Sequence, residues 1–114
     1  MSKKYNLKWT KSAKDDLLNI TAYIKRDSPS VAKDIYLKIK KQANSSNFFP
    51  LKGRIVPELQ KEGITTFREI VISPWRVIYT IESNTVYIIS ILDSRQDIEN
   101  LLMQKIIKGN RWDL

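Results

Sequence analysis

The 114-residue sequence contains no cysteine and no histidine. Without cysteine, the chain cannot form a disulfide, a thiolate nucleophile or a zinc site with cysteine ligands. Without histidine, it cannot build a Ser-His-Asp triad, and no imidazole can transfer protons near neutral pH. Any catalytic chemistry must therefore use Asp, Glu, Lys, Arg or Tyr, whose ordinary pKa values lie far from 7.

Long apolar segments are absent as well. No apolar run approaches the ~20 residues of a membrane-spanning helix, and the first residues, MSKKYNLKW, lack the apolar core of a secretion signal. The length suits one domain, which we place over residues 1–114. Apolar residues make up 42% of the chain and charged residues 28%, as in globular proteins. We expect a single soluble, cytoplasmic domain that does not contact a membrane.

Positive charge is in excess, with 20 Lys and Arg against 12 Asp and Glu and a net charge of +8. This balance favours an anionic partner, either a nucleic acid or an acidic protein. A lysine-rich surface that keeps the protein in solution would have the same composition. Charge alone leaves both interpretations open.

The first part of the chain has the pattern of one strand followed by two helices. Residues 5–9 alternate apolar and polar side chains, as a short strand does. Apolar residues at helical spacing predict a helix over residues 12–26, with Ser12 as the candidate capping residue. Ser28, followed by a proline, suits the N-cap of a second helix, roughly 29–44. The short joint between them predicts an antiparallel helical hairpin.

Residues 45–66 interrupt this regularity. Loops of this length are uncommon in compact domains and are often functional or partly structured. The pair Phe48-Phe49 is predicted to tether the segment to the core. The residues that break regular structure here are Pro50, Gly53, Pro57 and Gly63.

Three strands are predicted next, over residues 67–72, 75–81 and 85–92, each rich in β-branched and aromatic side chains. The turn residues Ser73-Pro74 separate the first two strands, and residues 82–84 separate the last two. Connections this short force an antiparallel meander.

A last helix is predicted after these strands, with Ser94 and Asp97 placed to cap it and Gly109 placed to end it. The order β-α-α-β-β-β-α predicts an α+β fold, an antiparallel sheet with the N-terminal helical hairpin packed on one face. The opposite face would then lack full cover and leave room for a binding surface.

Four of the arginines outside the helical hairpin stand near strand ends or in the long loop: Arg54, Arg68, Arg76 and Arg95. The meander can bring Arg76 and Arg95 close together, and a cluster of guanidinium groups on a half-covered face suits phosphate. A two-residue turn at Ser73-Pro74 would send Arg68 and Arg76 to opposite faces, and a three-residue turn would place them on one face. The alternative for each arginine is a surface position or a salt bridge with Glu69, Asp93 or Asp97.

Five stretches form a pattern over nearly the whole chain: WTKSAKDDLLNITAYI (9–24), DSP (27–29), FPLKGRIVPEL (49–59), REIVISPWRVIY (68–79) and VYIISILDSRQD (86–97). In order and spacing they resemble the RelE/ParE family of bacterial toxins from type II toxin–antitoxin pairs. The predicted order of helices and strands agrees with the fold of that family.

The resemblance implies a toxin that arrests growth and is neutralised by a cognate antitoxin protein that wraps it. RelE-like members cut messenger RNA in the ribosomal A site without metal, whereas ParE-like members bind DNA gyrase and are not nucleases. The target therefore stays open between the ribosome with mRNA and DNA gyrase. A degenerate toxin that only binds its antitoxin and a basic nucleic-acid-binding module without toxicity are further alternatives. We expect no metal and no small-molecule cofactor.

For a nuclease, the resemblance implies catalytic roles for four residues. Arg76 in WRVIY and Arg95 in DSRQ match family arginines that bind the scissile phosphate and stabilise its transition-state charge. Arg68 is the nearest basic residue to the paired lysines of RelE-like members, and Glu69 lies beside it. The candidate RNA- or phosphate-binding residues are Arg54, Lys52, Tyr79 and Tyr87.

Other parts of the nuclease pattern are missing. Leu101 stands where RelE-like enzymes carry a tyrosine in the last helix, and the chain ends WDL instead of with His-Tyr. Attack by a 2′-OH needs a base and an acid. Glu69 or Asp93 could act as the base, and Tyr79 or Tyr87 as the acid. The alternative is that the carboxylates pair with arginines and the tyrosines fill the core.

Overall fold

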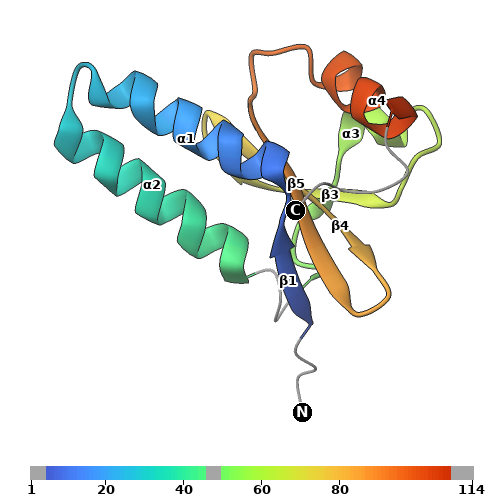
Figure 1. Cartoon of the computed structure of the whole chain (residues 1–114). Helices are drawn as coiled ribbons and strands as arrows, with labels where there is room; N and C mark the ends of the chain where they lie inside the picture. The colour runs from blue at the N-terminus through green and yellow to red at the C-terminus, as the bar shows by residue number, and fades with distance from the viewer. Residues whose placement is uncertain (1–4, 46–49, 109–114) are drawn as a thin grey trace.

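The structure is a computed structural model that describes residues 5–45 and 50–108. Figure 1 shows its elements, with the helical hairpin on one side and the two later helices on the other. No helix within these ranges combines the length and the apolarity that a membrane span requires. The elements are β1 (Asn6–Trp9), α1 (Lys11–Lys25), α2 (Pro29–Asn44), β2 (Arg54–Ile55), α3 (Pro57–Gln60), β3 (Phe67–Ile72), β4 (Trp75–Glu82), β5 (Thr85–Asp93) and α4 (Ile98–Lys108).

The five strands form one sheet in the order β1-β5-β4-β3-β2. The neighbours from β2 to β5 pair antiparallel, whereas β1 pairs parallel with β5. The predicted α+β fold and its order of elements are confirmed, with β2 and α3 added inside the long loop. One parallel pair is compatible with this topology because the long segment between β1 and β5 supplies the crossover that parallel strands require.

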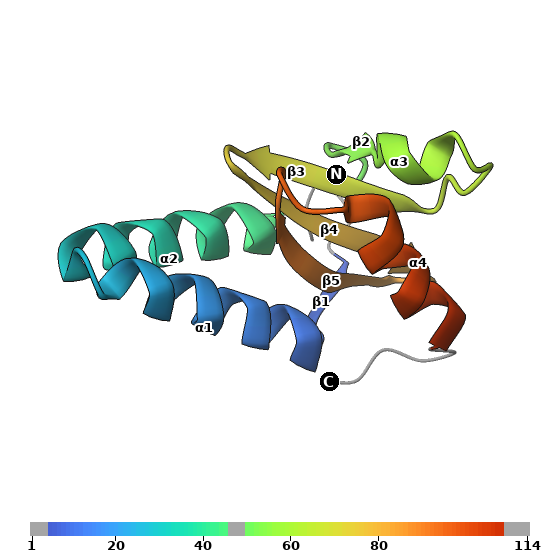
Figure 2. The ribbon, with the colours of Figure 1, turned by 90° about the horizontal axis from the view of Figure 1, so that it is seen from above.

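The helical hairpin packs on one face of the sheet, as predicted. Ala13 and Leu17 of α1 and Ile39 of α2 are buried against strand residues such as Val77 and Ile88. Apolar side chains at helical spacing thus give each helix one buried stripe. Figure 2 shows that the far ends of both helices extend beyond the sheet.

The opposite face of the sheet is also covered, contrary to the expectation of an open face. A second apolar cluster joins Leu59 of α3 and Leu102 of α4 to Ile78 and Ile89 of the sheet. Figures 1 and 2 place α3 and α4 together on the side away from the hairpin. The periodicity of the last helix predicts an apolar stripe, but it does not predict which face of the sheet that stripe covers. The expectation of an incompletely covered face is wrong for this reason.

The residue that caps α1 is Thr10 rather than Ser12. The Thr10 hydroxyl accepts a hydrogen bond from Ala13 N at 3.1 Å and donates one to Ile88 O at 2.8 Å. The cap therefore also fastens the start of α1 to β5. Ser28 caps α2 as predicted, with a proline at the first helical position.

The long loop is partly structured, as predicted, although Phe48-Phe49 lie outside the described residues. Its described tether is Tyr79 of β4, whose hydroxyl donates to Pro50 O at 2.7 Å and accepts from Gly53 N at 2.9 Å. A Cβ at Gly53 would stand 2.5 Å from the Tyr79 hydroxyl and 2.6 Å from Glu69 O. Only glycine lets the loop backbone approach β4 this closely.

We expect Gly53→Ala and Tyr79→Phe each to lower the free energy of unfolding by about 1–3 kcal/mol. The alanine overfills the contact, and the phenylalanine leaves Gly53 N and Pro50 O without their partner. Tyr87→Phe is the control, since Tyr87 is half-buried, and it should change stability by less than about 0.5 kcal/mol. Urea unfolding followed by circular dichroism measures all three. Wild-type stability of Gly53→Ala would contradict the tether.

Candidate functional site

The register of β3 and β4 decides which arginines share a face of the sheet. A two-residue turn, Ser73-Pro74, joins the strands, so that Val71 pairs with Arg76 and Arg68 pairs with Tyr79. Successive side chains of a strand point to opposite faces. Arg68 and Arg76 therefore lie on opposite faces, as the two-residue turn requires.

Arg76 lies on the face covered by α3 and α4, where only 5% of its surface is exposed. Its Nε donates to Glu69 Oε1 at 2.7 Å. Its Nη1 and Nη2 donate to the two carboxylate oxygens of Glu58 at 2.7 and 2.6 Å. This bidentate arrangement is the strongest that a guanidinium forms with a carboxylate. All three guanidinium nitrogens of Arg76 are thus engaged inside the protein.

Glu69 connects a second arginine to the first. Glu69 is only 1% exposed, and Arg54 Nε donates to its Oε2 at 2.5 Å. We call Arg54, Glu58, Glu69 and Arg76 together the ion network. Its two positive and two negative side chains balance, so no net charge remains there to hold an anionic substrate.

The pKa values of the ion network follow from these contacts. Hydrogen bonding to Arg76 lowers the pKa of Glu58 below its ordinary value. Hydrogen bonding to Glu58 in turn raises the pKa of the Arg76 guanidinium. Glu58 is the partner that the sequence did not reveal, because its place depends on the path of the long loop. The only local signal is Pro57, which suits the first position of a short helix.

The other predicted binding residues are divided between the core and the loop. Arg68 Nη1 donates to Gly53 O at 2.7 Å and so supports the loop backbone. Tyr79 is fully buried, and burial raises the pKa of its hydroxyl. Tyr87 packs half-buried beside the α4 cluster, and Lys52 is exposed in the loop. Their roles in binding RNA or phosphate stay predictions.

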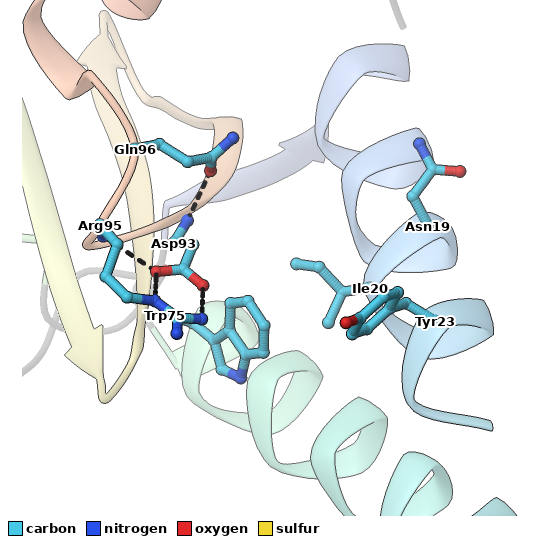
Figure 3. Close-up of a pocket in the computed structure, with 7 residues that line it drawn as sticks. All are labelled: Asn19, Ile20, Tyr23, Trp75, Asp93, Arg95 and Gln96. Carbon is cyan, nitrogen blue, oxygen red and sulfur yellow. Dashed lines mark hydrogen bonds and ion pairs between the residues drawn. The ribbon is translucent and has the colours of Figure 1, made fainter. Parts of the chain in front are cut away.

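Arg95 follows β5 and lies away from the ion network. Its Nε and Nη2 donate to the two oxygens of Asp93 at 2.9 and 2.6 Å, and its side chain is 81% exposed. Hydrogen bonds from Arg95 lower the pKa of Asp93 to about 2. Figure 3 shows this pair beside a groove between α1 and the end of the sheet.

This groove, which we call the Trp75 groove, has a volume of about 450 Å³. In Figure 3, Ile20 and Tyr23 of α1 lie across it from Trp75 of β4. Trp75 Nε1 is buried and has no hydrogen-bond acceptor among the residues that the structure describes. The two facing aromatic side chains suit the binding of an apolar or aromatic group. The remaining lining residues are Asn19, Asp93, Arg95 and Gln96.

The prediction that the arginines converge on one exposed patch is wrong. Trp75 and Arg76 are neighbours on β4 and point to opposite faces, so Trp75 faces the groove of Arg95 while Arg76 enters the ion network. The sequence also allowed the alternative of salt bridges, and three of the arginines form them. These are Arg54, Arg76 and Arg95. The catalytic roles that the resemblance implies for Arg68, Glu69, Arg76 and Arg95 stay predictions.

A second polar cluster, which the sequence did not reveal, joins α1, β5 and α4. Lys105 Nζ donates to Ser90 Oγ at 2.9 Å and also to Ser12 Oγ, while Ser90 Oγ donates to Asp16 Oδ2 at 2.7 Å. Burial lowers the pKa of Lys105. Ser90 is fully buried, so this cluster fastens α4 to α1 through β5.

Comparison with known proteins finds similarity along most of the chain. The family model of the ParE toxin of type II toxin–antitoxin systems, parDE, matches residues 7–98. A chain of the chromosomal ParDE system from P. aeruginosa is 20% identical with a TM-score of 0.65, covering 79% of this chain and 96% of that chain. A chain of the toxin–antitoxin complex RelBE2 from Mycobacterium tuberculosis is 18% identical with a TM-score of 0.51, covering 82% and 97%. At these identities the solved structures show a shared fold. No curated protein matches the chain.

Substitution of Arg76 and substitution of Arg95 should have very different effects on stability. Arg76→Ala leaves Glu69 enclosed without one of its partners and should lower the free energy of unfolding by about 3–5 kcal/mol. Arg95→Ala removes an exposed ion pair and should leave stability nearly unchanged. Chemical unfolding of both variants beside the wild type measures this. Equal effects would show that Arg76 is not the structural arginine of the pair.

The contribution of the Glu58–Arg76 ion pair to the free energy of unfolding should disappear in acid. A carboxylate whose folded pKa is lowered stabilises the fold above its unfolded pKa, and the contribution is lost as pH falls through the folded pKa. At about pH 7, Glu58→Gln should therefore be less stable than the wild type by about 1 kcal/mol, since the partly exposed pair is screened. The difference should shrink as pH falls below 4.5, the ordinary pKa of Glu58. A constant difference down to about pH 3 would contradict the ion-pair account.

Proposed function

The chain belongs to the ParE toxin family of type II toxin–antitoxin systems, and we propose that it is a growth-arresting toxin that acts by binding DNA gyrase rather than by cutting messenger RNA. Of the two mechanisms that the RelE/ParE resemblance implies, binding without catalysis is the one that the geometry favours. The observation that carries the proposal is the pairing of Arg76 with Glu58 and Glu69.

A guanidinium that stabilises a scissile phosphate has to present donors to it. Arg76 is poorly placed to do so in this arrangement, because its Nη1 and Nη2 donate to Glu58, its Nε donates to Glu69 and only 5% of its surface is exposed. A phosphate could reach Arg76 only by displacing Glu58 from a bidentate pair, at the expense of strong charge-assisted hydrogen bonds. This supports a structural role for the arginine that matches the nuclease motif.

The surroundings of the candidate acids and bases also support binding without catalysis. Both oxygens of Glu69 already accept hydrogen bonds from arginines. Asp93, with a pKa of about 2, is a weak base at neutral pH. The Tyr79 hydroxyl is buried and donates to Pro50 O. Proton transfer to and from an RNA substrate would therefore need groups from outside this set.

An antitoxin is the second proposed partner. Both solved relatives described above come from toxin–antitoxin systems, and the net charge of +8 suits an acidic protein. The antitoxin would hold the toxin inactive until it is removed.

Induced expression of the chain alone should arrest growth, and co-expression of the small protein encoded beside its gene should restore it. Purified chain should block supercoiling by DNA gyrase at roughly one toxin per gyrase site, because inhibition by binding is stoichiometric. The same preparation should leave messenger RNA on ribosomes intact. Supercoiling on gels and primer extension of ribosome-bound message measure the two activities.

Arg95→Ala is the control for the nuclease alternative, since its fold should remain intact. If wild-type chain cuts messenger RNA on ribosomes and Arg95→Ala does not, the arrest is catalytic and the gyrase proposal is overturned. If induction of the wild type leaves growth unaffected, the proposal of a toxin fails altogether.

A further inference from the structure

The ion network is enclosed at one end and reaches water at the other. The side chain of Glu69 is fully enclosed, whereas 31% of the Glu58 side chain is exposed. Arg76 lies between these two carboxylates, and its Nε donates to Glu69 at 2.7 Å. Glu69 therefore orients the guanidinium from the inside, and Glu58 is the member that can leave the ion network by turning its side chain into water.

The backbone of α3 does not have to move when Glu58 leaves. Leu59, the next residue along α3, is fully buried in the apolar cluster that α3 shares with α4. Lys61, which follows the helix, forms a salt bridge of 2.8 Å with Glu99 of α4. These contacts hold α3 on both sides of its exposed edge, so the carboxylate of Glu58 can exchange with another anion while the fold stays closed.

A second guanidinium lies near the place that the Glu58 carboxylate occupies. Arg54 is 60% exposed at its side chain and, among the residues that the structure describes, donates hydrogen bonds through Nε alone, to Glu69 Oε2. Hydrogen bonding to Arg76 is the main reason that the pKa of Glu58 is lowered, and the nearby charge of Arg54 lowers this pKa further. Two positive side chains thus act on one carboxylate at the surface.

We propose that Glu58 occupies, and thereby blocks, a binding site for one phosphodiester group of a nucleic acid. With Glu58 turned away, Nη1 and Nη2 of Arg76 donate to the two non-bridging phosphate oxygens as they now donate to the two carboxylate oxygens. Glu69 keeps Nε and the orientation of the guanidinium. The side chains of Arg54, Arg76 and Glu69 then carry one net positive charge, which a single phosphodiester neutralises.

The chemistry of the group that Glu58 replaces favours a phosphodiester over a free phosphate ion. A carboxylate and a phosphodiester each carry one negative charge on two equivalent oxygens, whereas a phosphate monoester carries about −1.5 to −2 at pH 7.

The pair of Arg95 and Asp93 does not make a comparable site. The arginine there is 81% exposed, and Asp93 takes its lowered pKa from Arg95 alone among the charged side chains. A second guanidinium and an enclosed carboxylate that orients the first one distinguish the place of Glu58.

The blocked site is tested by comparing Glu58→Ala with Glu62→Ala, which makes the same change in net charge at an exposed position just after α3. The probe is a short fluorescent oligouridylate, and its anisotropy reports binding to the purified chain. Glu58→Ala should bind at least about fivefold more tightly than Glu62→Ala at low salt. Its log–log dependence of affinity on salt should be steeper by about 0.7, the value for one additional phosphate contact on a single strand.

Two further measurements identify the site and its ligand. Asp93→Ala also frees an arginine from its carboxylate, and it should bind the oligouridylate no more tightly than Glu62→Ala. Potassium phosphate should displace the oligouridylate from Glu58→Ala no better than potassium chloride of equal ionic strength. Circular dichroism checks the fold of each variant. If Glu58→Ala is unfolded, Glu58→Gln, which keeps the shape of the side chain, is compared with Glu62→Gln in its place.

Each outcome decides the proposal. Equal affinities and equal salt dependences of the folded Glu58 and Glu62 variants would overturn the blocked site. An equal gain in Asp93→Ala would show that any freed arginine binds the strand, and it would remove the special role of the ion network. Preferential displacement by potassium phosphate would overturn the assignment to a nucleic acid. None of these measurements uses DNA gyrase, so the blocked site and the proposed function can fail independently.

Discussion

The arrangement of the second half of the molecule depends on the enclosure of Glu69. A carboxylate at 1% exposure is tolerated only when opposite charges and hydrogen bonds surround it. Arg54 and Arg76 supply them, and Arg76 recruits Glu58. These contacts fasten β2 to β3 and α3 to β4. Because Leu59 of α3 shares an apolar cluster with α4, the same ionic contacts help to close one face of the sheet.

A guanidinium can occupy the start of a strand for two different physical reasons. A catalytic arginine keeps donors free for the substrate, whereas a structural arginine fills its donors with acceptors from its own chain. The flanking residues of WRVIY are apolar and fit both cases. The residue that separates them is Glu58, which lies 18 positions from Arg76 in the sequence. A short motif match therefore identifies the family of the chain without fixing the role of its arginine.

Periodicity predicted the helical hairpin, the three-stranded meander and the final helix because such patterns report contacts between near neighbours in the chain. The contacts that it missed join distant residues. Thr10 caps α1 partly because its hydroxyl also donates a hydrogen bond to Ile88 O, 78 positions away. The face that α4 covers depends on where the chain crosses the sheet. The separation of Arg76 from Arg95 follows from strand alternation and from carboxylates whose positions only the folded loop determines.

The different uses of arginine and lysine explain how a chain with a net charge of +8 can show no arginine patch within residues 5–45 and 50–108. The planar, weakly hydrated guanidinium suits bidentate pairs in enclosed sites, whereas the compact, strongly hydrated ammonium stays in water. The arginines of the sheet and loop are largely neutralised, so the lysines of the hairpin dominate the field that a partner meets. Such a field acts over about 8 Å at physiological salt, so it attracts acidic groups toward the hairpin without fixing where each of them lies.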